Sequence, residues 1–152
     1  MAKKNKRTYG SWESPITADV IITQGLGLGE TLVYRQDVFW LETRPTEQGR
    51  GVVVRKTTDG KHSDMIPQGF SARSAVHEYG GGVYAVNSLG FYFVNWDDQR
   101  IYGIRKDGSI RALTPLSEKQ KSVRYADLTA EDSWLCCVRE RHNSDREPIN
   151  DL

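Results

Sequence analysis

The chain has 152 residues, of which 38% are hydrophobic and 27% charged, and its formal net charge is +1. This composition is typical of one ordinary globular domain, and its balanced charge gives no general reason to expect binding to nucleic acid or membranes. No apolar run is long enough to span a membrane, and the N-terminus lacks a secretory signal. We therefore expect a cytoplasmic protein in which the adjacent cysteines, Cys136 and Cys137, stay reduced.

Residues 1–28 are predicted to form a basic tail and a lead-in segment. The first seven residues carry four positive charges, on Lys3, Lys4, Lys6 and Arg7. A solvated terminus is the commoner use of such a tail, and a nucleic-acid-binding arm is the alternative. The glycine-rich GLGLGE at 25–30 fails as a dinucleotide fingerprint, because Glu30 stands where the last glycine is needed. We expect these glycines to form a flexible approach to the first strand.

The rest of the chain reads as strands separated by turns. Helical periodicity is almost absent, and 117–121 is predicted to make a single helical turn at most. β-Branched and aromatic runs, bounded by turn signals such as Asp59-Gly60 and Asp107-Gly108, predict an all-β fold. The expected strands are 31–34, 37–42, 52–56, 83–86, 91–95, 100–105, 125–128 and 134–139.

An internal repeat organises these strands. The segments that begin at Phe39 and Phe91 each run through an aromatic strand, a polar loop, a second strand, an Asp-Gly turn and a short strand closed by proline. Asp59 and Asp107 are 48 positions apart, and a third, weaker copy places Ile149 a further 48 positions after Ile101. A period of about 40–50 residues with about four strands per unit is typical of β-propeller blades.

The predicted fold is therefore a partial β-propeller of about two and a half four-stranded blades, at about 29–67, 82–115 and 125–152. The third unit stops in what should be its third strand. If ~400 Å² of apolar blade face stayed in water, about 10 kcal/mol of stabilisation would be forgone at ~25 cal/mol per Å². We expect such a chain to be the front piece of a longer protein, or to self-associate through its open blade faces.

Five motifs in a fixed order resemble the start of the prolyl-oligopeptidase family of serine peptidases, of the dipeptidyl aminopeptidase and acylaminoacyl-peptidase kind. The resemblance implies that an N-terminal propeller caps a C-terminal α/β-hydrolase domain, and that it admits peptides while excluding folded proteins. The missing hydrolase domain is then the expected partner, and a peptide is the expected substrate of the parent protein. The motifs are YGSWESPIT at 9–17, FWLETRPTEQGR at 39–50, VHEYGGG at 76–82, DQRIY at 98–102 and RYADL at 124–128.

The catalytic half of such an enzyme is absent from this sequence. A hydrolase nucleophile needs a Gly-x-Ser-x-Gly turn, and the nearest match, GFSAR at 69–73, fails at its last position. No histidine follows a candidate nucleophile in a suitable context, so a catalytic triad cannot be assembled. We therefore expect this chain to be non-catalytic, with no catalytic residue, metal or cofactor.

VHEYGGG is the segment with the strongest claim to a function. As a metal site it lacks a third ligand. As a structural element its glycines permit positive φ and close backbone approach before a strand. A substrate-facing role is the alternative: Glu78 is the candidate for a peptide's amino end, which the resemblance implies. Arg44 and Arg73 are candidates for a peptide carboxylate, with a solvated surface position as the commoner role of such residues. The predicted structural residues are His77, Tyr79, Gly80, Gly81 and Gly82.

Two further interpretations stay open. Trp40 and Trp134 lie in expected strands and are predicted to be blade core, whereas Trp96 is predicted to pack a turn. Trp12 would complete an aromatic stripe if the protein bound sugars, which we regard as the weaker interpretation. The rival to the peptidase fragment is a stand-alone β-propeller-type binding module that completes its ring by oligomerisation.

Overall fold

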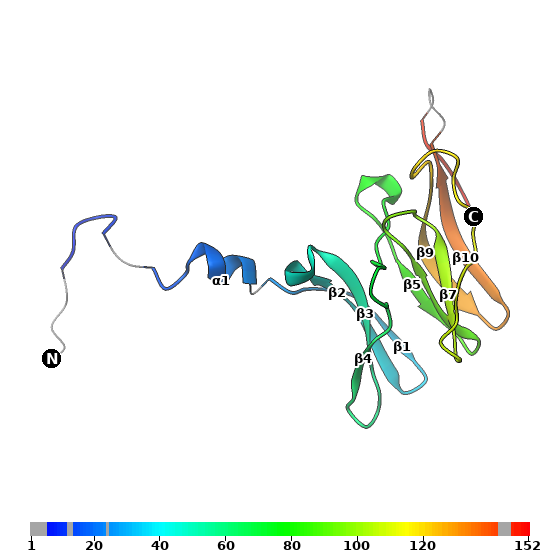
Figure 1. The fold of residues 1–152 in the computed structure, drawn as a ribbon, viewed down its shortest axis with the longest axis horizontal. Helices are drawn as coiled ribbons and strands as arrows, with labels where there is room; N and C mark the ends of the chain where they lie inside the picture. The colour runs from blue at the N-terminus through cyan, green and yellow to red at the C-terminus, as the bar shows by residue number, and fades with distance from the viewer. Residues whose placement is uncertain (1–5, 12–13, 24, 143–146) are drawn as a thin grey trace.

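The computed structural model describes residues 6–11, 14–23, 25–142 and 147–152. It contains three antiparallel sheets that follow one another in chain order and lie side by side (Figure 1). This arrangement confirms the predicted all-β, partial-propeller fold. The N-terminal segment and its short helix α1 (Ala18–Thr23) extend away from the sheets (Figure 1).

Each sheet is built from strands that are consecutive in the sequence, as in a propeller blade. We call the sheets blades 1, 2 and 3. Blade 1 consists of β1 (Gly27–Tyr34), β2 (Asp37–Arg44), β3 (Arg50–Lys56) and β4 (His62–Asp64), with a short 3-10 turn η1 (Pro45–Glu47) between β2 and β3. Blade 2 consists of β5 (Tyr84–Val86), β6 (Gly90–Val94), β7 (Ile101–Arg105) and β8 (Ile110–Ala112). Blade 3 consists of β9 (Val123–Glu131), β10 (Trp134–Arg141) and β11 (Ile149–Asp151).

The repeat seen in the sequence is confirmed strand by strand. The Asp-Gly turns lead into the short strands β4 and β8, and their glycines Gly60 and Gly108 both have φ +81°. This left-handed conformation costs glycine little, which explains the residue at these turns. Ile149 opens β11 as Ile101 opens β7, and each strand is the third of its blade.

Two local expectations were wrong, and a third held. Helix α1 was not expected. The Thr17 hydroxyl accepts the Val20 N–H at 3.2 Å near its start, as an N-cap residue does, but the helix has only six residues and is too short to show a helical period in the sequence. At 117–121 the structure has a turn and no helix, which agrees with the prediction of one turn at most: the Ser122 N–H donates to the Lys119 carbonyl at 3.1 Å. The glycines of GLGLGE are not a flexible approach, because β1 already begins at Gly27. No helix in the described part of the chain is long and apolar enough to cross a membrane.

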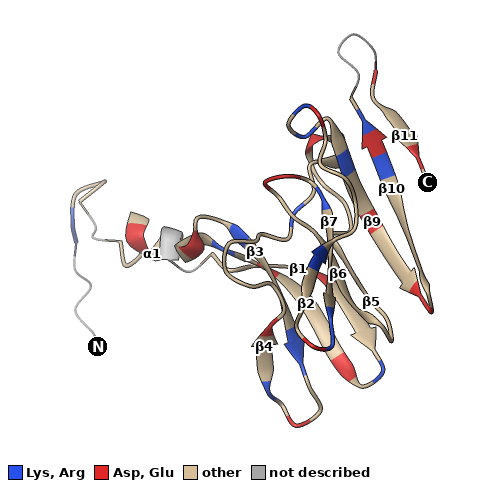
Figure 2. Ribbon diagram, turned by 45° about the vertical axis from the view of Figure 1, so that its right-hand side comes forward, with Lys and Arg blue, Asp and Glu red and all other residues tan. Residues whose placement is uncertain are grey.

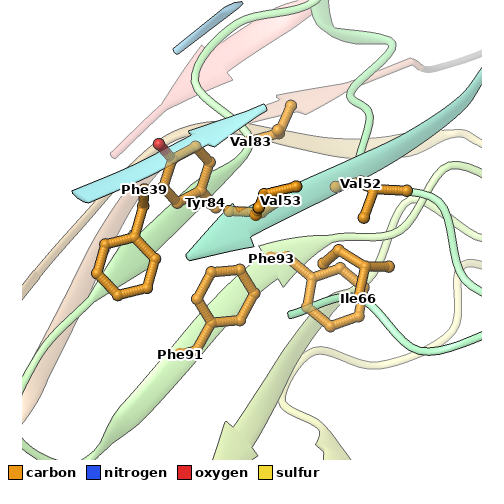
Figure 3. Packing of buried hydrophobic residues seen from close by; sticks show 10 residues of the cluster. Phe39, Val52, Val53, Ile66, Val83, Tyr84, Phe91 and Phe93 are labelled. Carbon is orange, nitrogen blue, oxygen red and sulfur yellow. The ribbon is translucent and has the colours of Figure 1, made fainter. Parts of the chain in front are cut away.

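The interface between blades 1 and 2 is a continuous apolar core. Aromatic rings from both blades meet there, and Phe39 stacks on Phe91 with ring centroids 6.5 Å apart (Figure 3). Phe93 is fully buried and contacts the rings of Phe70 and Tyr102, each at 5.7 Å. The buried members of this cluster are Phe39, Val52, Val53, Val54, Ile66, Ala72, Val83, Tyr84, Phe91 and Phe93.

The interface between blades 2 and 3 has a smaller apolar cluster and more polar contacts. Its buried apolar members are Ala85, Val94, Ile101, Tyr125 and Leu128. Around them, the connection between β4 and β5 is hydrogen-bonded to blade 3, for example through Ser74 Oγ, which donates to the Tyr125 carbonyl at 2.7 Å. Blade 3 is thus held by hydrogen bonds as well as by apolar contacts.

The tryptophans divide between buried and exposed positions. Trp40 packs at the edge of the first core and donates its ring N–H to Glu42 at 2.9 Å. Trp134 is 50% exposed, which contradicts its predicted place in a blade core, because no described element covers that part of β10. Trp96 lies in the β6–β7 loop as expected. Trp12 lies outside the described residues, as do Lys3 and Lys4 of the basic tail.

Candidate functional site

The VHEYGGG segment lies where the β4–β5 connection passes against blade 3. Its first three residues form the 3-10 turn η2 (Val76–Glu78), in which His77 and Glu78 have φ of +52° and +66°. Such left-handed backbone is uncommon for residues other than glycine and costs on the order of 1 kcal/mol each. The turn therefore needs support from its neighbours, and β9 and β10 supply it.

Glu140 on β10 is the centre of that support. Its side chain is fully buried, and its carboxylate accepts the His77 N–H at 3.0 Å. The ring Nε2 of His142 lies 2.6 Å from the same carboxylate, and Arg124 Nη1 lies 3.4 Å away. Burial acts to raise the pKa of Glu140, but the hydrogen bonds from His142 and His77 outweigh it, so that the pKa is lowered overall. The carboxylate is therefore held ionised inside the protein.

Arg124 on β9 connects this buried carboxylate to the surface. Its Nη1 donates to the Ala75 carbonyl at 2.7 Å and to the Glu78 carboxylate at 2.5 Å. The Arg124 side chain is 12% exposed, whereas that of Glu78 is 76% exposed. Glu78 is thus placed by its partner but open to solvent, and its remaining carboxylate oxygen lacks a protein partner among the described residues. Figure 2 shows acidic and basic segments together at the arrowhead end of β10.

The three glycines allow the segment to approach β9 closely. Gly80 has φ +96°, which requires glycine or strain. At Gly81 an added Cβ would lie 2.9 Å from both the Ala126 Cβ and an Asp127 carboxylate oxygen. The Gly82 N–H donates to Asp127 Oδ1 at 2.8 Å. Glycine at 81 therefore lets the backbone reach the carboxylate that binds the next residue.

A second carboxylate holds the same segment from the side of blade 1. Glu30 Oε2 accepts the Val83 N–H at 2.8 Å, and the Tyr84 hydroxyl donates to the Glu30 carbonyl. Partial burial raises the pKa of Glu30; the Val83 hydrogen bond opposes this, and the nearby charge of Asp127 adds to it. Two acids, one from each of the blades that flank blade 2, thus hold the start of β5 between them.

Glu30 and Asp127 occupy corresponding positions of their blades. Each lies at a bulge in the first strand, where the pairing shifts between Gly29 and Leu32 in β1 and between Ala126 and Thr129 in β9. Their φ angles, +41° and +53°, are also alike. Sequence analysis did not identify either residue. The sequence feature that could have identified them is that each acid stands at the same distance before a hairpin turn, Glu30 before the β1–β2 turn and Asp127 before the β9–β10 turn.

A hollow of about 560 Å³ opens beside these acids. Its wall includes carboxylate, guanidinium, hydroxyl and phenol groups together with the glycine backbone, so it suits a polar ligand. Tyr79 is 86% exposed at its rim and stacks on His77 with centroids 5.8 Å apart. Residues lining the hollow include Glu30, Arg73, Ser74, Tyr79, Gly81 and Gly82.

The two arginines predicted to face substrate have different surroundings. The Arg44 guanidinium is bound to Asp64 by two hydrogen bonds of 2.6 and 2.8 Å, and also contacts Glu42 and Glu47, so it ties blade 1 together. The Arg73 side chain is exposed and stacks over the Trp96 ring. The structure brings Arg73 and Glu78 to the same connection, and leaves Arg44 within blade 1.

The three described histidines have acidic or aromatic partners. His77 and His142 face Glu140, and His62 packs edge-on against the Trp40 ring with centroids 5.3 Å apart. No group of three His, Cys, Asp or Glu side chains in the described ranges is arranged to hold a metal ion.

Comparisons with known proteins identify structures of similar sequence and fold. No protein-family model matches the chain, and no curated protein matches it. A puromycin-hydrolysing peptidase of Mycobacterium tuberculosis aligns with 98% of this chain at 33% identity and a TM-score of 0.83. A puromycin hydrolase aligns with 91% at 28% identity and a TM-score of 0.80, and a serine-to-alanine mutant of a puromycin hydrolase, in complex with PGG, aligns with 95% at 28% identity and a TM-score of 0.82.

The matches cover only part of those proteins. This chain spans 24% of the M. tuberculosis peptidase and 22% and 24% of the two hydrolase structures. The matched part is the N-terminal propeller of prolyl-oligopeptidase-family peptidases. Over nearly its whole length, then, the chain is similar in sequence and fold to about a quarter of a puromycin-hydrolysing peptidase, as a fragment of the prolyl-oligopeptidase family would be.

Proposed function

We propose that the chain is the N-terminal propeller portion of a prolyl-oligopeptidase-like serine peptidase, in which it gates substrates and forms part of the peptide-binding cleft without taking part in the chemistry. The observation that carries this proposal is the alignment of 98% of the chain with 24% of a peptidase at 33% identity. Residues 1–28 would be the lead-in segment and residues 29–152 the incomplete propeller, facing a C-terminal hydrolase domain in the cytoplasm.

Gating follows from the rigidity of such a ring. Blades joined through a packed aromatic core open only at a high cost in buried apolar area. A ring of this kind passes an extended peptide through its opening or side and rejects a folded protein by size. The parent would then be an exopeptidase of the dipeptidyl aminopeptidase or acylaminoacyl-peptidase kind.

Glu78 is our candidate for holding the free amino end of the peptide. Its carboxylate is oriented by Arg124 yet remains 76% exposed, so it has both a fixed position and a free face. An ammonium group bound there forms a charge-assisted hydrogen bond, which is stronger than a neutral one. Arg73 is the candidate for a carboxylate, whereas at Arg44 a substrate would have to displace Asp64, Glu42 or Glu47.

A chimeric enzyme tests this proposal. The matching quarter of a puromycin-hydrolysing peptidase is replaced by this chain, and kcat/KM is measured on a chromogenic aminoacyl substrate and on its N-acetylated twin. We expect an active chimera in which Glu78→Gln lowers kcat/KM about tenfold for the free amine only, the loss expected for one charge-assisted hydrogen bond. Glu131→Gln, an exposed acid at the β9–β10 turn, is the matched control.

Two outcomes would contradict the proposal. A folded chimera without activity would show that this propeller does not serve such a catalytic domain. Labelling of a serine in the isolated chain by a fluorophosphonate probe, or hydrolysis of an aminoacyl substrate by it, would show that the chain carries its own nucleophile. We expect neither.

A further inference from the structure

A second hollow lies between blades 1 and 2, and the proposed function does not use it. It has a volume of about 300 Å³ and is lined by the β1–β2 turn and by the ends of β3, β5 and β7. Because successive strands are antiparallel, these segments lie together at one end of the blades, whereas the VHEYGGG segment lies at the other end (Figure 1). The second hollow is therefore separate from the candidate site.

The deep part of the second hollow is apolar. Phe39 of blade 1 and Phe91 of blade 2, whose rings stack across the interface, both line it and are both buried. Met65 and Ile104 line it as well and are only partly buried, so they lie nearer to solvent. A ring or a short alkyl group placed there removes apolar surface from water, which stabilises a complex by about 25 cal/mol per Å².

Two arginines of blade 1 lie on the same side of that blade as the apolar wall. Arg55 stands opposite Phe39 in the register of β2 and β3, so both side chains are on the face that meets blade 2. Tyr34 stands opposite Asp37 at the β1–β2 turn, and the Arg35 Cζ is 5.4 Å from the centroid of the Tyr34 ring. Arg35, Asp37 and Arg55 all line the hollow.

Positive charge exceeds negative charge in this lining. Asp37 Oδ2 accepts hydrogen bonds from Arg55 Nε at 2.8 Å and from Arg55 Nη2 at 2.5 Å. Arg35, and Lys106 in the turn after β7, also line the hollow, and in the described part of the chain neither forms a hydrogen bond or ion pair with a carboxylate. Arg105 is not counted, because strand alternation turns its side chain to the other face of β7. Three cations and one carboxylate leave an excess of two positive charges.

We propose that the second hollow binds a small organic anion, an aromatic ring or short alkyl group that carries a phosphate or a carboxylate. The apolar part lies against Met65 and Ile104, and the anionic group accepts hydrogen bonds from the planar Arg35 guanidinium and is attracted by Lys106. The volume is at the lower end of the range for small-molecule sites, which limits the ligand to about one ring and its anionic group. Blades 1 and 2 are both four-stranded, so the site does not depend on the peptidase proposal.

Isothermal titration calorimetry of the full chain with phenyl phosphate and, separately, with phenylacetate tests this site. Inorganic phosphate at the same ionic strength is the reference, and we expect it to bind more weakly because it gains nothing from the apolar wall. Arg35→Gln and Lys106→Gln should each weaken binding of the aryl anion about tenfold, the effect of losing one charge-assisted contact. Arg111→Gln is the matched control, because Arg111 is also exposed but pairs with Gly103, on the opposite face of blade 2 from Ile104.

Each outcome decides for or against the site. Saturable binding of one aryl anion or of both supports it and identifies the preferred anionic group. Inorganic phosphate that binds as tightly as phenyl phosphate, or equal losses in Arg35→Gln and Arg111→Gln, overturns it, because either result reports charge attraction without the hollow. The absence of saturable heat with both aryl anions also overturns it. Arg35 and Lys106 are exposed, so we expect circular dichroism to show an unchanged fold in each variant.

Discussion

The two blade interfaces of this protein differ in their share of apolar and polar contacts. Between blades 1 and 2, ten buried residues form one aromatic and aliphatic core. Between blades 2 and 3, five buried apolar residues are supplemented by Glu140, Arg124, Asp127 and their hydrogen bonds. Apolar contacts are nearly indifferent to pH and direction, whereas buried ionic contacts depend on geometry and on protonation. Glu78, the candidate for the peptide's amino end, lies at the second, more polar interface.

The largest expected effect concerns the first interface. Phe93→Ala removes a fully buried ring that contacts Phe70 and Tyr102, so we expect a loss of about 3–5 kcal/mol in the free energy of unfolding. Chemical denaturation measures it. Leu128→Ala is the counterpart in the smaller cluster and should cost less. Equal losses would remove the distinction drawn between the two interfaces, and Leu116→Ala, at an exposed position, should change little.

The second effect is expected at the buried carboxylate. Glu140→Gln removes the charge that His142 and Arg124 face. We expect the free energy of unfolding to fall by about 3 kcal/mol, the lower end of the range for breaking a buried ionic contact. The lower end applies because Arg124 keeps its contact with Glu78. The pKa of Glu140 is lowered on folding, so its stabilisation is present above its ordinary pKa and is lost as pH falls through the lowered value.

Denaturation at several pH values measures this dependence. Between about pH 5 and pH 3 the wild-type protein should lose stability more steeply than Glu140→Gln, in line with the linkage relation. Glu131→Gln serves as the control and should follow the wild type. Identical slopes for wild type and Glu140→Gln would mean that the carboxylate does not support the second interface.

A smaller effect is expected at the close backbone approach. Gly81→Ala places a Cβ 2.9 Å from Ala126 and Asp127, so blade 3 must shift, at a cost of about 1–3 kcal/mol. The control is Gly29→Ala, because a Cβ there meets nothing within 4 Å and φ is not positive. Comparable thermal stability of the two variants would show that the segment is not pressed against β9.

The smallest effect on stability is expected at Glu78. Its ion pair with Arg124 is largely exposed, so Glu78→Gln should change the free energy of unfolding by about 0–1 kcal/mol, as measured by denaturation. Glu140, which binds the same arginine in the interior, is the comparison. A loss as large as that of Glu140→Gln would make Glu78 a structural residue and remove it as a substrate contact.

The amino-acid sequence determined the local architecture of this protein. Alternating apolar residues, Asp-Gly turns and a step of 48 residues indicated the strands, the order of the sheets and the place of Ile149 at the start of a third strand. These features depend on neighbours in the chain, because strand alternation and turn conformation are set within a few residues. The short helix α1 escaped notice because six residues carry little periodicity.

Only the tertiary structure decided which side chains meet. The His77 N–H reaches a carboxylate 63 positions away, and Glu30 binds Val83 53 positions away. The exposure of Trp134 and the convergence of Arg73 and Lys121 on Trp96 likewise follow from how the blades and their connections are placed. No local pattern encodes such contacts, because they depend on how two sheets, each folded by its own turns, pack against one another.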